Sequence, residues 1–596
     1  MRLALAFVLG VLSWPRPAAA APQPERAWEH ARTLVRDIGP RPAGSPQALA
    51  AAQYVAEHFE AAGVPTERVP VGTQRVPEIM LGALRVSAAR TVVLDDESIV
   101  ATIDATGGAG GPAILVMAHV DTVPGSPGAI DNAAAVGVLL ELGRALALEP
   151  VRPHDVILVA TAGEEPGLVG ARAVAAHLEP GRVGVAIALD LVGRRGPLTL
   201  NGLSSLLGRD WLERIATAGQ TAAAAIDAPL THQVVSRFAP QLERSDHGVF
   251  TALGVPAFHL YHRGPGRIYL QYHRPQDDLE QIDPAATAAT LAWLHAFVLD
   301  PDPLPPSSVP PNAPIAATWL PVGDGWIVRD ASLSALALVL AALCALGVYR
   351  SATLGGSATP SDTRWRARVI ASSTALGVAL LAWLVLLALD ATPARMGAHA
   401  QPWIHAPGRW ILATVLVLAA LLVVGAAGLR RWPELARSAG TPAIVLAAAP
   451  GLALWWLGIV ALAWIPLLQA AALASIGWAR GPRTRALVLG FALVPAWACT
   501  DPALLREASF HGFLAGDVAL AAVLVLPWLP ASIAAVRMLA VVRLPVRTRF
   551  GILAVAITGW LAVVIGSALG DRVCPGSAFR SDGLACELAF EQPASP

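Results

Sequence analysis

Hydrophobic and polar positions follow two different patterns along the chain. In the first part, short apolar runs of strand length alternate with segments whose apolar residues recur at helical spacing. This alternation predicts an α/β domain over residues 24–300, in which a mostly parallel sheet lies between layers of helices. The expected helices cover residues 25–37, 46–62, 132–148, 168–177 and 284–298, and the clearest buried strands are 113–118, 156–160 and 183–189.

After a proline-rich linker at 301–330, the sequence becomes dominated by alanine, leucine, valine and tryptophan. Most of its apolar stretches approach the roughly 20 residues that a helix needs to cross a bilayer. They predict an all-α polytopic membrane domain of about eight helices over residues 331–570, followed by a tail at 571–596. The stretches lie near 333–348, 369–389, 410–429, 444–459, 461–478, 486–499, 513–536 and 552–569.

The N-terminus and the loop charges predict the orientation in the membrane. Residues 1–21 combine a basic start, a short apolar core and a run of alanines, which is typical of a secretory signal peptide; an uncleaved anchor is the alternative. Arginines gather in alternate loops of the second half. The positive-inside rule then places the catalytic domain and the tail outside the cytoplasm, in a periplasmic, extracellular or lumenal space.

Charge and cysteine content narrow the function classes. The formal net charge is zero, which does not favour a nucleic-acid partner or an acidic substrate. Cys574 and Cys586 follow the last apolar stretch, and a disulfide between them would suit an oxidising compartment. The sequence leaves this pairing open, and it carries no information on oligomeric state.

Metal-binding side chains follow the strand-like runs of the first domain. Open α/β sheets bind ligands beyond the carboxyl ends of their strands, so these side chains are expected to converge. Imidazoles with carboxylates suit zinc, with manganese or cobalt as lesser options, and indicate a hydrolase. The expected ligands are His119, Asp131, Glu165, Asp190 and His273.

Residue chemistry suggests roles for several of these groups. In His119-Val-Asp121, the Asp121 carboxylate is expected to accept the second ring N–H of His119 and so to orient a metal-binding imidazole. Asp131 has two oxygens and can bridge two cations. Glu164 and Glu165 are adjacent and project in different directions, so we assign Glu165 as a ligand and Glu164 as the general base.

Six segments together resemble the di-zinc aminopeptidase family, which includes secreted leucyl aminopeptidases and aminopeptidase Y. A soluble domain followed by a multispan region is closest in layout to the endoplasmic-reticulum metallopeptidase (Fxna-type) group. One departure is Ala133-Ala134 after the bridging aspartate, where the family usually has Ser-Gly. The segments are His119-Val-Asp121, Pro127 to Asn132, Gly163 to Gly170, Leu189 to Gly193, Ser245-Asp-His247 and Tyr272 to Asp277, and Ile38 to Ser45 resembles an N-terminal signature.

The resemblance implies a division of the ligands between two zinc ions. His119 and Asp190 would hold one ion, Glu165 and His273 the other, with Asp131 shared and Glu164 as base. It also implies that Tyr272 steadies the oxyanion, with an ordinary packed tyrosine as the alternative. Asp246 and His247 would support the site.

The leading hypothesis is therefore a membrane-anchored zinc metallopeptidase, an aminopeptidase that acts on peptides or proteins outside the cytoplasm. A carboxypeptidase or a glutaminyl cyclase-like relative, which needs only one zinc, is an alternative. A non-catalytic receptor with a peptidase fold is another. A transport role for the membrane region is disfavoured, because its spans carry almost no ionisable residues at mid-depth.

Overall fold

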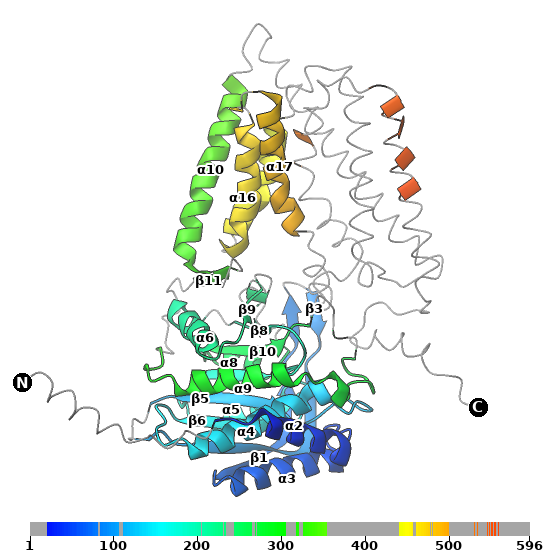
Figure 1. Cartoon of the computed structure of the whole chain (residues 1–596), viewed down its shortest axis with the longest axis vertical. Coiled ribbons are helices and arrows are strands. Elements are labelled where there is room, and N and C mark those ends of the chain that lie inside the picture. The colour runs from blue at the N-terminus through cyan, green and yellow to red at the C-terminus, as the bar shows by residue number, and fades with distance from the viewer. Residues whose placement is uncertain are drawn as a thin grey trace, which may run out of the picture. The chain divides into compact units, whose positions relative to one another are not determined.

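The fold is described from a computed structural model of the chain (Figure 1). The expected signal peptide, the tail with Cys574 and Cys586, and most of the spans predicted at 369–429 and 513–569 lie outside the described residues. The structure describes residues 21–81, 84–106, 111–203, 206–229, 232–233, 236, 244–264, 269, 271–305, 317–320, 326–353, 440–456, 460–476, 478–479, 481–499 and single positions between 530 and 559.

The chain divides into two compact units. The first contains residues 1–265 and 271–329, and the second contains residues 266–270 and 330–596. The predicted site residues all belong to the first unit.

An eight-stranded mixed sheet forms the centre of the first unit, with the order β1-β4-β6-β5-β7-β10-β8-β9. Its middle strands β6, β5, β7 and β10 run parallel, whereas β4 is antiparallel to both β1 and β6, and β8 is antiparallel to β10 but parallel to β9. The predicted mostly parallel sheet is therefore confirmed for the centre. The strands are β1 (Thr66–Val76), β4 (Arg90–Ile103), β5 (Ala113–His119), β6 (Val156–Thr161), β7 (Val183–Leu189), β8 (Leu198–Asn201), β9 (Ile226–Asp227) and β10 (Ala257–His262).

Helices cover both faces of this sheet. Every residue of β5, β6 and β7 is buried, as expected for strands that have helices on both sides. On one face, Leu115 and Met117 share a core cluster with Ala171 and Val174 of α5. Side chains alternate along a strand, so Ile114 and Val116 point to the opposite face, where α4 contacts β5 and α2, α3 and α9 pack against α4.

The helix boundaries follow from local sequence signals. The Ser45 hydroxyl accepts a hydrogen bond from the backbone N–H of Ala48, and Asp283 does the same for Ala285, with a proline at the first helical position in both cases. All five predicted helices of this unit are present. They are α2 (Pro24–Arg32) continued by η1 (Thr33–Ile38), α3 (Pro46–Ala61), η2 (Ala129–Ala133) continued by α4 (Ala134–Leu148), α5 (Val169–His177) and α9 (Pro284–Leu299). The described residues of this unit also form α6 (Arg209–Thr221), α8 (His247–Ala252) and η4 (Leu279–Gln281).

Two small antiparallel pairs complete the first unit. One pairs β2 (Ile79–Leu81) with β3 (Leu84–Ser87). The other pairs β11 (Ala317–Leu320) with β12 (Trp326–Arg329) inside the segment expected as a linker. Gln233 fixes β11 by donating to the carbonyl oxygen of Trp319 and accepting from its N–H. The linker region thus contains ordered structure that packs on the first unit.

The described part of the second unit consists of apolar helices: α10 (Asp330–Thr353), α15 (Gly440–Trp456), α16 (Val460–Ser475) and α17 (Pro482–Cys499). Helix α16 contacts the other three, and small residues let them approach closely: a Cβ on Gly347 would lie 2.3 Å from that of Ala474. Among the described residues, one segment is long and apolar enough to cross a membrane, Asp330–Tyr349 with a mean hydropathy of 2.4. The eight-span membrane domain stays a prediction.

Candidate metal centre

The strand order explains why the predicted ligands meet. Strand β5 lies between β6 and β7, and the chain passes from β5 to β6 on one side and then to β7 on the other. Such a reversal of strand order is where open α/β sheets place their ligands. His119 is the last residue of β5, Glu164 and Glu165 follow β6, and Asp190 follows β7 directly.

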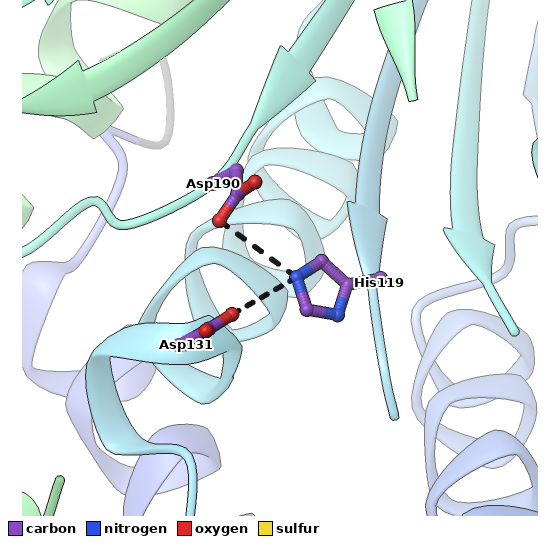
Figure 2. Close-up of side chains that lie close together, drawn as sticks. All are labelled: His119, Asp131 and Asp190. Atoms are coloured by element: carbon purple, nitrogen blue, oxygen red, sulfur yellow. Dashed lines mark ion pairs between the residues drawn. The ribbon is translucent and has the colours of Figure 1, made fainter. Parts of the chain in front are cut away.

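The first cluster contains His119, Asp131 and Asp190 (Figure 2). The Nε2 atom of His119 lies 3.2 Å from Oδ1 of Asp131 and 3.8 Å from Oδ1 of Asp190. His119 and Asp131 are buried, and Asp190 is nearly so. In this arrangement one imidazole nitrogen and two carboxylate oxygens face the same point.

The second cluster contains Asp131, Glu165 and His273. The Nε2 atom of His273 lies 3.3 Å from Oδ2 of Asp131 and 3.2 Å from Oε2 of Glu165. Asp131 thus belongs to both clusters, with one oxygen directed to each. This division of the five residues is the one implied by the sequence resemblance.

Asp131 is held by the turn that starts α4. The turn begins at Gly128, whose φ of +62° is unfavourable for residues with a Cβ. Next to Asp131, the Asn132 side-chain amide donates to the carbonyl oxygen of Leu189 at 2.7 Å, which ties the turn to the end of β7. The peptide bond between Asp131 and Asn132 is cis.

Asp121 makes a different contact from the expected one. The Nδ1 atom of His119 donates to the backbone carbonyl oxygen of Asp121 at 3.0 Å, whereas the nearest carboxylate oxygen of Asp121 is 3.8 Å away. The Asp121 carboxylate instead accepts hydrogen bonds of 2.8, 3.0 and 3.1 Å from the backbone N–H groups of Gly163, Glu164 and Glu165. The reason is that the turn after β6 presents three successive N–H groups, which together bind a carboxylate better than one ring N–H does.

The neighbouring carboxylates favour the protonated form of both imidazoles by raising their pKa. Burial by itself lowers the pKa of His119, but the carboxylates of Asp131 and Asp190 outweigh it and raise the pKa well above its usual value. Burial also lowers the pKa of His273, but the carboxylates of Asp131 and Glu165 outweigh this effect and raise the pKa to about 10. Burial alone would raise the pKa of Asp131, yet the two imidazoles hold it below its usual range.

The pKa values of Glu164, Glu165 and Tyr272 are all raised, which favours the neutral form of each group. Burial raises the pKa of Glu164 well above its usual value, with His119 opposing and Glu165 adding to the shift. Burial and the Asp131 charge raise the pKa of Glu165 to about 7. Burial and the surrounding carboxylates, Asp131 foremost, raise the pKa of Tyr272, whose ring stacks on His273 at 3.7 Å between centroids. Tyr272 is therefore a neutral phenol beside the second cluster.

The residues fit divalent cations. Four buried atoms of the clusters have no hydrogen-bond partner among the described residues: His119 Nε2, Asp131 Oδ2, Glu165 Oε1 and His273 Nε2. Buried polar atoms are nearly always satisfied, so four such atoms on the residues of the two clusters indicate that a further binding partner belongs between these residues. Nitrogen and carboxylate oxygen donors without thiolates suit zinc, and also manganese or cobalt.

Asp246 and His247 belong to neither cluster. The Asp246 carboxylate accepts a hydrogen bond from the Thr161 hydroxyl at the end of β6, and burial raises its pKa to about 6. The His247 ring stacks on His259, whose Nε2 atom lies 3.0 Å from the carbonyl oxygen of Asp190. Asp246 therefore contacts the end of the strand that precedes Glu164 and Glu165, and His247 contacts β10, whose His259 reaches the backbone of Asp190.

Solved structures of aminopeptidases are similar to part of this chain. An aminopeptidase from Aneurinibacillus sp. strain AM-1 has a TM-score of 0.39 and 18% identity, covering 49% of this chain and 97% of that one. BSAP, a zinc aminopeptidase from Bacillus subtilis, has a TM-score of 0.38 and 17% identity, covering 46% of this chain and 95% of that one.

Sequence comparison gives a relative and a family. Aminopeptidase YwaD of Bacillus subtilis is 31% identical over 178 residues, which cover 28% of this chain and 36% of that protein's length. Residues 98–298, which contain all the predicted ligands, match the model of peptidase family M28. The family match and the aminopeptidase relative support the assignment of residues 98–298 to peptidase family M28.

Proposed function

We propose that this chain is a membrane-anchored metallo-exopeptidase, specifically an aminopeptidase, that uses two zinc ions to hydrolyse N-terminal peptide bonds. The observation that carries the proposal is the position of Asp131, whose two oxygens face separate imidazoles at 3.2 and 3.3 Å. His119 and Asp190 would hold one ion, and Glu165 and His273 the other, with Asp131 shared. When bound, the ions act as Lewis acids that polarise the scissile carbonyl and promote ionisation of the attacking water.

Glu164 is the general base in this proposal. Its carboxyl group is buried, and its raised pKa brings proton uptake closer to neutral pH. The carboxylate accepts the proton of the attacking water and then passes it to the nitrogen of the leaving amine. The Asp121 carboxylate fixes the backbone of Glu164 and Glu165, so that one side chain serves as base and its neighbour as ligand.

Tyr272 is the donor to the oxyanion in this proposal. A neutral phenol can donate a hydrogen bond to the negative oxygen that develops on the scissile carbonyl. Its stacking on His273 fixes the ring beside the second cluster. Tyr272 thus needs no change of protonation during the reaction.

The membrane anchor is supported by the apolar helix α10 and by the arginine-rich alternate loops of the second half. An exported catalytic domain would meet peptides or proteins outside the cytoplasm. The role of the membrane region in this proposal is attachment to the bilayer.

The test uses the full-length chain purified in detergent. Zinc content is measured, and a peptide library is digested and its products are identified by mass spectrometry. Two zinc ions with stepwise loss of N-terminal residues would support the proposal. Loss of C-terminal residues would indicate a carboxypeptidase. One zinc ion together with cyclisation of N-terminal glutamine would indicate a glutaminyl cyclase, and bound zinc without turnover would indicate a receptor.

A further inference from the structure

The turn that presents Asp131, residues 127–131, is here called the Asp131 loop. Its first two carbonyl groups point to Arg41, which lies in the segment before α3. Arg41 Nη1 donates to the carbonyl oxygen of Pro127 at 2.9 Å, and Nη2 donates to that of Gly128 at 3.3 Å. Arg41 is itself fixed, because its Nε donates to the carbonyl oxygen of Val120 at 3.0 Å and only 1% of the residue is exposed.

The next three N–H groups of the loop point to Asp277. Its Oδ1 accepts from the N–H of Ile130 at 2.9 Å and its Oδ2 from that of Asp131 at 3.1 Å. The N–H of Ala129 donates to the carbonyl oxygen of Asp277 at 3.1 Å. Asp277 is fully buried, so these bonds form away from water and are expensive to lose.

The loop has no room for a side chain at Gly128. A Cβ on Gly128 would lie 2.3 Å from Cγ2 of Thr122 and 2.4 Å from the carbonyl oxygen of Asp131. Both approaches are far inside van der Waals contact. The backbone is therefore tightly packed at Gly128, and each of the five loop residues makes a hydrogen bond through at least one backbone group.

We propose that Arg41 and Asp277 are positioning residues which hold the Asp131 loop from opposite sides and thereby fix the carboxylate shared by the two metal sites. This inference rests on the proposed two-zinc function. The Arg41 guanidinium donates hydrogen bonds to the carbonyl oxygens of residues 127 and 128, and the Asp277 carboxylate accepts hydrogen bonds from the N–H groups of residues 130 and 131. Neither side chain contacts the cations in this arrangement; both act through Asp131.

Two conservative variants test this role through metal binding. Arg41→Lys keeps the positive charge but has a single nitrogen, which cannot reach all of the carbonyl oxygens that the guanidinium contacts. Asp277→Asn keeps the shape of the side chain but replaces one accepting oxygen with an NH₂ group, which cannot accept a hydrogen bond from the backbone N–H that faces it. The full-length chain is stripped of metal and titrated with Zn²⁺ against a chromophoric chelator. Both variants are expected to lower zinc affinity at both sites by about 10–100-fold.

Arg214→Lys is the matched control. Arg214 is also buried and also donates to carbonyl oxygens, those of Asp302, Phe297 and Asp300, far from the ligands in the sequence and not in either cluster. Its substitution should lower the melting temperature as Arg41→Lys does but leave zinc affinity within about twofold, because loss of a buried network destabilises without moving Asp131. The double variant Arg41→Lys/Asp277→Asn should lose less affinity than the product of the single losses, since both act on one loop.

The possible outcomes distinguish the positioning role of Arg41 and Asp277 from the proposed two-zinc function. Two tightly bound zinc ions in the wild type, with equal affinity in Arg41→Lys and Asp277→Asn, would refute the positioning role and leave the proposed function standing. An equal loss of affinity in Arg214→Lys would also refute it, by showing a general effect of destabilisation. If Arg41→Lys does not fold, the isosteric Asp277→Asn decides alone. A wild type that binds no zinc would overturn the proposed function and this inference together.

Discussion

The Nε2 atom of His273 lies 3.3 Å from Oδ2 of Asp131, although a large part of the first unit separates the two residues in the chain. The other oxygen of the same carboxylate faces His119. One short turn before α4 therefore serves two clusters at once.

Asp131→Asn should reduce the zinc content of the purified chain from two ions to less than one. An amide is a poorer ligand than a carboxylate, and both ions lose the same bridging group. Metal analysis by mass spectrometry measures the result. Asp190→Asn is the comparison, because Asp190 belongs to one cluster only and its loss should mainly affect one ion. Full zinc content in Asp131→Asn would disprove the bridge.

Glu164→Gln should reduce kcat by about 10²–10⁴-fold and leave zinc content unchanged, because only the proton acceptor is removed. Steady-state kinetics on aminoacyl chromogenic substrates measures the loss. Glu97→Gln is the control, since Glu97 lies on β4 in a partly exposed ion pair with Arg68. Activity of Glu164→Gln close to that of the wild type would remove Glu164 from the mechanism.

Zinc affinity should rise with pH. In the metal-free chain the pKa of His273 is raised to about 10, so His273 is protonated at neutral pH and must release this proton to bind zinc. Raising the pH lowers that cost, and affinity should increase by up to about tenfold per pH unit for each proton released, levelling off above the pKa of His273. Chelator competition at several pH values measures the slope. An affinity that is flat between about pH 6 and 9 would show that the imidazoles are not ligands.

Asp121→Asn should weaken zinc binding at the second cluster by about 10–100-fold, with a smaller effect at the first. The reason is that the Asp121 carboxylate accepts from the N–H groups of Gly163, Glu164 and Glu165, while the His119 ring donates to the Asp121 backbone, which the substitution keeps. Stepwise zinc titration resolves the two sites. A selective loss at the His119 site would instead favour the contact that the sequence suggested.

The elements that position the site could be predicted because their signals are local. Strands β5, β6 and β7 are continuous apolar runs bounded by polar residues, and helices α3 and α9 begin at a capping residue followed by proline. The hairpin of β1 with β4 gave no comparable signal, because its outer strand mixes charged and apolar residues and is partly exposed. The pattern beyond residue 330 predicts spans, of which the described residues contain α10 as one segment of sufficient length.

The sequence by itself determined which side chains stand at the carboxyl ends of the central strands, since strand length and ligand chemistry are properties of short segments. Tertiary structure decided what each of those side chains touches. It directed the Asp121 carboxylate to the turn after β6 instead of to His119, and it placed Arg41 and Asp277 on the two sides of the Asp131 loop. These contacts join segments that are remote in the chain, and they depend on loop backbone shape, which neither periodicity nor residue type specifies.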